Sequence, residues 1–155
     1  MKINKYIEKP GEYEVKIKYG KEGEEKDYVG VVNAKERGVY KIGILVEHLV
    51  KATKGKVVVR AVVSTGARVE LSGRVVINKV AQQTDSFLEL RVLLLDDDST
   101  ASVDPQLEIL ANEVKAGHAA SVGKIDEEQI KYIKSRGVSE KQARELIVEG
   151  FIKGE

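Results

Sequence analysis

The segment "KGKVVVRAVVSTGARVELSGRVVINKV", Lys54 to Val80, decides the fold, because short runs rich in β-branched residues follow one another with only a few polar residues between them. Such runs favour β-strands, and the separators "STG" and "SG" favour turns. A parallel strand–helix–strand unit needs a connecting helix of about ten residues or more, and no segment here has that length. The stretch therefore leaves a sandwich, a barrel or a coiled solenoid.

The same pattern continues on both sides of this segment. "VYKIGILV" begins at Val39 and "FLELRVLLL" ends at Leu95. Val57–Val59 and Leu93–Leu95 are apolar at consecutive positions, which is typical of strands covered on both faces. Together with the short turns, this favours a β-solenoid. No repeat is visible residue by residue, and periodicity alone fits a sandwich equally well.

Closer to the N-terminus, Tyr13–Tyr19 alternates apolar and polar residues, as a half-buried strand does. A polar, glycine-containing connection, Gly20–Asp27, separates it from a second strand-like run, Tyr28–Val32. The spacing predicts that the two runs pair as a hairpin with a loose turn.

The C-terminal part changes to a helical pattern. Asp126 is a good N-cap, acidic residues follow it, and Gly137 ends the first helix. Ser139 and Gln142 have the spacing of a capping box at the start of the second helix. We expect helices over residues 126–135 and 139–152, a β-rich core over residues 1–122 and a helical subdomain over residues 123–155.

Composition excludes several classes of protein. The chain has 155 residues, a net charge of +1 and no cysteine, so it offers neither a disulfide nor a thiolate metal ligand. The balanced charge, and the acidic residues of the second terminal helix, argue against a nucleic-acid partner. No apolar run is long enough to span a membrane, and residues 1–10 lack the apolar stretch of a signal peptide. We therefore expect a cytoplasmic protein without a membrane partner.

His118 lies among small residues, in "KAGHAASVG". A lone histidine is more often structural than a ligand, and neither a neighbouring carboxylate nor His48 completes a metal-binding spacing. The small residues do indicate that the backbone approaches either another strand or a partner surface closely.

The stretch "DPQLEILANEVKAGHAASVGKIDEEQIKYIKSRGVSEKQARELIVEGF", Asp104 to Phe151, resembles the C-terminal signature of the SufB/SufD (SufBD) scaffold proteins of iron-sulfur cluster assembly. The typical family string reads P-x-L-E-I, then D-V-K-C-x-H-G-A-T-x-G, then D-E-E-x-x-F-Y-L-x-S-R-G-I and a last helix. The preceding "QTDSFLELRVLLLDDDSTASVD", Gln83 to Asp104, is similar to the strand that comes before this signature in the family. These matches keep a fixed order and are more specific than a short motif.

This resemblance implies a right-handed parallel β-helix of few rungs with a C-terminal two-helix subdomain. It also implies that members pair through their β-helices and bind a SufC-type ABC ATPase through their terminal helices. The resemblance further implies that sulfur and iron are received at the interface between paired subunits. Family scaffolds are usually much longer and carry a helical N-terminal domain, so we expect a short version without that domain.

The resemblance also gives candidate residues by position. His118 falls on the interface histidine of the family and is the candidate metal ligand, whereas Ala116 falls where many members have cysteine. Because a methyl group binds neither iron nor sulfur, we expect no stably bound cofactor, only a transient iron-sulfur cluster shared with a cysteine-bearing partner. The helices match the ATPase-docking segment, which makes Tyr132, Ile133, Arg136 and Ala143 partner-contact candidates. Packing against the core explains the apolar ones equally well.

The expected function is that of a non-catalytic SufBD-like component. It forms a homodimer, or a heterodimer with a SufB-like subunit, and docks a SufC-like ABC ATPase. We expect no enzyme, because no nucleophile, base and orienting group lie at mutual spacing. The alternative is a structural or regulatory interaction module with the family fold but without cluster chemistry. A third possibility, a β-sandwich with an unrelated helical tail, requires antiparallel strands.

Overall fold

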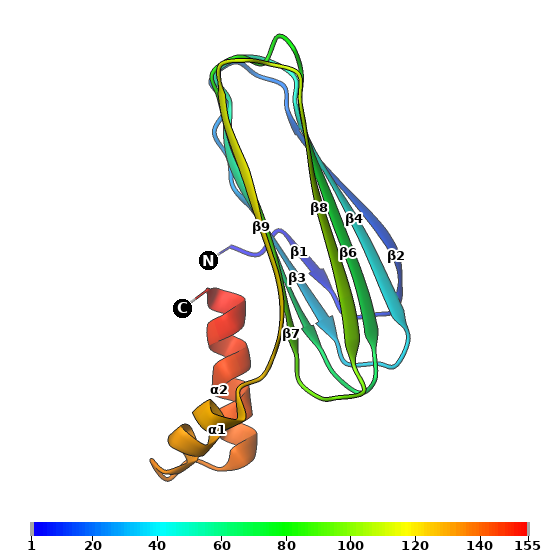
Figure 1. Ribbon diagram of the computed structural model, residues 1–155, viewed down its shortest axis with the longest axis vertical. Helices are drawn as coiled ribbons and strands as arrows, with labels where there is room; N and C mark the ends of the chain where they lie inside the picture. The colour runs from blue at the N-terminus through cyan, green and yellow to red at the C-terminus, as the bar shows by residue number, and fades with distance from the viewer. Residues whose placement is uncertain (1, 155) are drawn as a thin grey trace.

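The computed structural model describes residues 2–154, which fold into a long parallel β-solenoid followed by two helices (Figure 1). The strands are β1 (Lys5–Ile7), β2 (Gly11–Tyr19), β3 (Tyr28–Ala34), β4 (Val39–His48), β5 (Lys54–Val63), β6 (Arg68–Ile77), β7 (Thr84–Leu94), β8 (Thr100–Ile109) and β9 (Val114–Lys124). The helices are α1 (Glu127–Lys134) and α2 (Glu140–Lys153). β9 runs past the boundary expected at residue 122.

Successive strands alternate between two sheets. Sheet A has the order β1-β3-β5-β7-β9, sheet B has the order β2-β4-β6-β8, and every pair of neighbours is parallel. Each coil therefore contributes one strand to each sheet. Parallel pairing confirms the β-solenoid and excludes the antiparallel sandwich.

The coils repeat with a nearly constant length. Val39 pairs with Arg68, and Arg68 pairs with Thr100, so that each coil takes about 30 residues. His48 pairs with Ile77 and Lys54 pairs with Asp85, so the corner after β6 holds more residues than the equivalent corner after β4. This longer corner, residues 78–83, projects beyond the others as the green loop in Figure 1.

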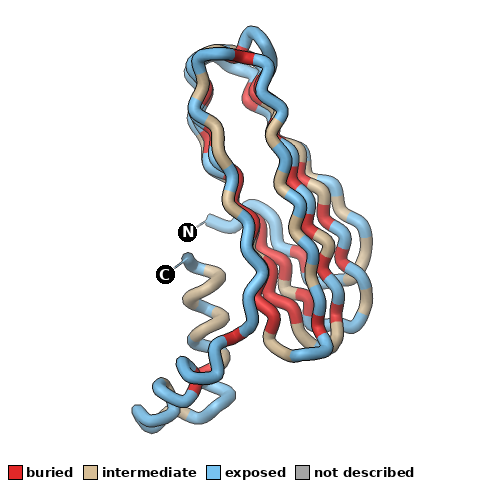
Figure 2. Tube along the Cα trace, in the orientation of Figure 1, coloured by how far each residue is buried: buried red, intermediate tan, exposed pale blue. Residues whose placement is uncertain are grey.

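The core lies between the two sheets. Inward-facing Ile, Val and Leu side chains of β4 to β7 fill it, and their burial alternates along the strands (Figure 2). The last coil, β8 and β9, is mostly intermediate or exposed because no further coil covers it among residues 2–154. The solenoid therefore has a well-packed middle and open ends.

The predicted N-terminal hairpin is wrong. β2 pairs in parallel with β4, and β3 pairs with β1 and β5 in the other sheet. The connection Gly20–Asp27 turns a corner between sheets instead of reversing the chain within one sheet. Alternation identified both strands correctly, but it carries no information about which strand lies beside which.

A second correction concerns the expected turn at Ser72–Gly73. β6 continues through both residues without interruption. A Cβ added at Gly73 would lie 2.8 Å from Cδ2 of Leu88 in the opposite sheet, so glycine gives that side chain room here. The glycine marks a close approach across the core.

Helix α2 covers the outer face of sheet A. The outward-facing Val58, Val62 and Leu93 are therefore buried like their inward-facing neighbours, which explains the consecutive apolar residues of β5 and β7. Arg60 anchors the end of the helix, because its guanidinium lies 3.4 Å from both the Ile152 carbonyl and the Glu89 carboxylate. No helix among residues 2–154 is long and apolar enough to cross a membrane.

Candidate functional site at the open end of the solenoid

His118 lies on β9, at the open edge of sheet A. It pairs in register with Leu88 of β7, and its side chain is exposed. The Ile125 amide donates to the Leu94 carbonyl at 2.9 Å, so the odd-numbered residues of β9 direct their backbone groups toward β7. The N–H and C=O groups of Ala116, His118 and Ala120 consequently face the open edge.

Small residues surround His118 on β9, which pairs with β7 in a regular parallel register. A Cβ at Gly117 would sit 3.4 Å from the Phe87 ring, in ordinary van der Waals contact. The close approach expected around His118 therefore stays a prediction. Ala116 and Ala120 flank His118 on the same face of the strand.

The open end also exposes apolar side chains at the rim of the solenoid. Ile109, Leu110 and Val122 are exposed, and Leu107 is half-buried against the core. Pro105 lies within β8, which is possible because its nitrogen faces the free edge and removes no hydrogen bond to β6.

His118 has no ligating partners within the described chain. Among residues 2–154, no three His, Cys, Asp or Glu side chains gather in a way that could hold a metal ion. One exposed imidazole without further ligands does not make a metal centre. Any metal at His118 therefore needs ligands from another molecule.

The helical subdomain is built by the caps expected from the sequence. The Asp126 carboxylate accepts a hydrogen bond from the Glu128 amide at 2.9 Å, and Ser139 and Gln142 form the full capping box. Gly154 ends α2 in the left-handed conformation at φ 81°. These caps confirm both predicted helices.

A small second core joins the helices to the solenoid. Leu93, Ile125, Ile130 and Ala143 are buried together, and Ile133 packs partly buried against them. Ala143 is 0% exposed, so it is a packing residue between α1, α2 and the last strands. It does not lie on the accessible surface.

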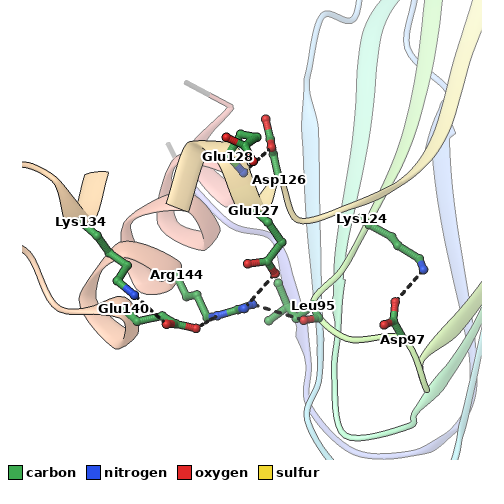
Figure 3. A network of polar contacts seen from close by, with 9 residues as sticks. All are labelled: Leu95, Asp97, Lys124, Asp126, Glu127, Glu128, Lys134, Glu140 and Arg144. Atoms are coloured by element: carbon green, nitrogen blue, oxygen red, sulfur yellow. Dashed lines mark hydrogen bonds and ion pairs between the residues drawn. The ribbon is translucent and has the colours of Figure 1, made fainter. Parts of the chain in front are cut away.

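Arg144 connects three elements at this junction, as Figure 3 shows. Its guanidinium donates to the Glu127 carboxylate at 2.9 Å and to the Leu95 carbonyl at 3.4 Å. Glu140, which pairs with Lys134 at 2.9 Å, lies 3.5 Å from the same guanidinium. These contacts restrain α1 and α2 relative to the end of β7.

The exposed surface of α1 carries Tyr132 and Arg136. Tyr132 is 61% exposed, and its hydroxyl accepts a hydrogen bond from the Arg136 guanidinium at 2.7 Å. The guanidinium also lies 5.1 Å from the centre of the tyrosine ring. The pair forms an exposed aromatic and cationic patch of the kind that is frequent in protein interfaces.

The structure brings together a polar cluster that the sequence analysis missed. His48 is fully buried and stacks on Tyr19 with ring centroids 4.3 Å apart. Its Nδ1 lies 2.8 Å from the Thr53 hydroxyl and its Nε2 lies 2.9 Å from the Ser86 hydroxyl. Burial lowers the pKa of His48 to about 4, so the ring is neutral near pH 7. The length of one coil places Tyr19 beside His48, so a coil repeat recognised in the sequence would have predicted this pair.

Comparison with known proteins agrees with this architecture. Residues 12–151 match the family described as "SUF system FeS cluster assembly, SufBD core domain". The iron-sulfur cluster assembly protein SufB of Bacillus subtilis (strain 168) is 37% identical over 105 residues, which cover 68% of this chain and 23% of that protein.

An iron-sulfur cluster assembly SufBD family protein of Staphylococcus aureus (strain USA300) is 32% identical over 131 residues, covering 84% of this chain and 28% of the relative. The chain thus spans about a quarter of the length of these relatives. The family match, the identities and the parallel solenoid with its two terminal helices together show that this chain belongs to the SufBD core family of iron-sulfur cluster assembly proteins.

Proposed function

We propose that this chain acts in iron-sulfur cluster assembly as a non-catalytic scaffold subunit whose open β8–β9 end meets a second subunit. The observation that carries the proposal is the position of His118, which is exposed on the edge strand β9. The backbone groups of Ala116, His118 and Ala120 face no other strand among residues 2–154. An unpaired edge is a template for strand addition. The occupant is a SufB-like subunit or a second copy of this chain.

In this arrangement, His118 supplies one neutral imidazole ligand to iron at the subunit seam. Ala116 lies on the same edge and offers no thiolate, so the sulfur ligands come from a cysteine-bearing partner. The iron-sulfur cluster is cargo that forms between the subunits and leaves again.

The helical subdomain is the proposed docking site for a SufC-like ABC ATPase. Tyr132 and Arg136 form its accessible contact patch, Ile133 lies at the margin, and Ala143 maintains the packing beneath. The contacts of Arg144 hold both helices in place, so that a force applied to them reaches the solenoid.

The test combines the purified chain, a cysteine-bearing SufB-like subunit and a SufC-type ATPase under anaerobic conditions with iron and sulfide. We expect the chain alone to stay colourless and the assembled complex to develop cluster absorbance and deliver it to an apo-ferredoxin. His118→Ala is expected to reduce delivery at least several-fold, whereas Lys115→Ala, on the opposite face of the same strand, retains it. A stable cluster on the chain alone would contradict the proposal.

A second candidate function is an interaction module without cluster chemistry, and Ala116 in place of a thiol favours it. The same assay separates the two functions. Unchanged delivery by His118→Ala, together with loss of ATPase binding by Arg136→Glu, would support the module and rule out a ligand role for His118.

A further inference from the structure

The other end of the solenoid carries an open edge of a different kind. Within residues 2–154, β2 pairs with β4 only and forms the edge of sheet B opposite β8 (Figure 1). The Leu49 amide donates to the Tyr19 carbonyl at 3.0 Å, so the odd-numbered residues of β2 direct their backbone groups toward β4. The backbone groups of the even-numbered residues therefore face outward along the edge. The Lys18 carbonyl already accepts a hydrogen bond from the Lys26 ammonium at 2.5 Å, so the free stretch is Glu12–Lys16.

These even-numbered residues are two acids followed by two bases: Glu12, Glu14, Lys16 and Lys18. All four side chains are exposed on the outer face of sheet B. Lys18 lies 3.8 Å from Glu47, and the other three form no ion pair within residues 2–154. On β4, Glu14 and Lys16 stand beside the uncharged Gly43 and Leu45. The charges of Glu12, Glu14 and Lys16 are thus available to another molecule, whereas that of Lys18 is partly balanced by Glu47.

The order of these charges complements itself when the strand is reversed. If a second β2 runs antiparallel with Val15 opposite Val15, Glu14 faces Lys16 and Glu12 faces Lys18 on both sides of the two-fold axis. The same register places edge-facing backbone groups opposite each other, as an antiparallel ladder requires. Opposite charges directly across such a ladder are favourable.

Neighbouring registers are disfavoured. Centring the axis on Glu14 or on Lys16 places like charges directly opposite each other, and a shift by one residue would pair edge-facing groups with groups already bonded to β4. In the favoured register, the inward-facing Tyr13 of one copy lies opposite Ile17 of the other. Charge and backbone geometry therefore select a single alignment.

From this we infer that β2 is a homotypic docking edge, on which a second copy of this chain adds antiparallel about Val15. The open edge of β8 lacks such complementarity, because the charged side chains on its outer face, Asp104 and Glu108, are both acidic. On the outer face of β9, Lys115 is the only charged side chain. Among the open edge strands longer than three residues in the described chain, only β2 has a charge pattern that complements its own reverse.

This interface is separate from the one proposed at β8–β9. The β2 edge forms an isologous contact, in which the same surface is used on both copies. A chain that uses both interfaces can link two subunit interfaces of the β8–β9 type through one contact between β2 strands. Because the two edges share no residues, each can be changed without touching the other.

The test uses single and paired charge reversals, followed by sedimentation velocity of the full chain over a wide concentration range. We expect the unmodified chain to form a dimer that is favoured by concentration and weakened by salt. Glu14→Lys and Lys16→Glu are each expected to weaken self-association about tenfold or more. The double variant E14K/K16E restores it, because each reversed charge again meets its opposite.

Mixing gives an independent readout. E14K and K16E, each weakened alone, are expected to form a heterodimer detectable by native mass spectrometry with one copy mass-tagged. Circular dichroism and melting curves check that every variant folds. A monomer at all concentrations, or a dimer that survives both single reversals, would overturn the inference. A dimer lost instead on Ala119→Lys in β9 would assign self-association to the other end and also overturn it.

Discussion

At the scale of single residues, the two histidines of the chain have opposite environments. His118 is exposed at an edge and lies among small residues, whereas His48 is enclosed by Tyr19 and by the hydroxyls of Thr53 and Ser86. Sequence spacing showed only that the two do not form a local metal motif. Which one is buried depends on the coil register, which local patterns do not reveal.

The enclosed His48 makes stability depend on pH. The imidazole takes up a proton near pH 6.5 in the unfolded chain but only near pH 4 in the folded one, so the unfolded state binds more protons between these values. We expect the contribution of His48 to the free energy of unfolding to be fully present at pH 7 and to fall by about 3 kcal/mol as the pH drops from 6.5 to 4.

Urea denaturation at a series of pH values measures this effect. His48→Gln removes the titrating group and is expected to flatten the profile in that range, although it lowers overall stability. His118→Gln serves as the matched control for the loss of a histidine and keeps the slope, because it leaves His48 unchanged. A slope that persists in His48→Gln would assign the pH dependence to other groups.

At the scale of secondary-structure elements, the helices were predictable and the pairing of the strands was not. Asp126 and Ser139 are local signals, because an N-cap satisfies backbone amides only two or three residues away. The alternation of β2 and β3 was equally readable, but their predicted hairpin was wrong. Pairing partners in this fold lie a whole coil apart, and nothing within β2 specifies β4.

The capping box of α2 provides a test at this scale. Ser139→Ala removes the hydroxyl that accepts from the Gln142 amide, and we expect a loss of about 1 kcal/mol in the stability of the helical subdomain. Hydrogen exchange of the first turn of α2 measures it. Ser121→Ala, on exposed β9, is the control and should change little. An unaltered exchange rate in Ser139→Ala would show that packing, not the cap, determines where the helix begins.

At the scale of the whole molecule, the chain is a stack in which each coil contacts mainly its neighbours. Its stability is expected to behave as a sum over coils and interfaces. Consecutive apolar residues and short turns predicted this architecture, although a sandwich fitted the periodicity equally well. The sequence did not reveal which strands are the edges within residues 2–154 or which side chains those edges expose. A strand is an edge only because of which strands pair with it, and local patterns do not specify that pairing.

Amide hydrogen exchange should show this stacking directly. We expect the strongest protection in β5 and β7, which are bonded on both sides and covered by α2. In β9, the amides of Ala116, His118 and Ala120 should exchange much faster than those of Gly117 and Ala119, which donate to β7. Uniform protection along β9 would mean that its edge is already covered in solution.

The projecting corner after β6 has a practical consequence. Its additional residues lie outside both ladders, and Val80 is exposed at its tip. A peptide tag or fluorophore inserted at Val80 leaves both open edges of the solenoid and the helical subdomain accessible. A label at this corner can therefore report the association of subunits in real time without disturbing their interfaces.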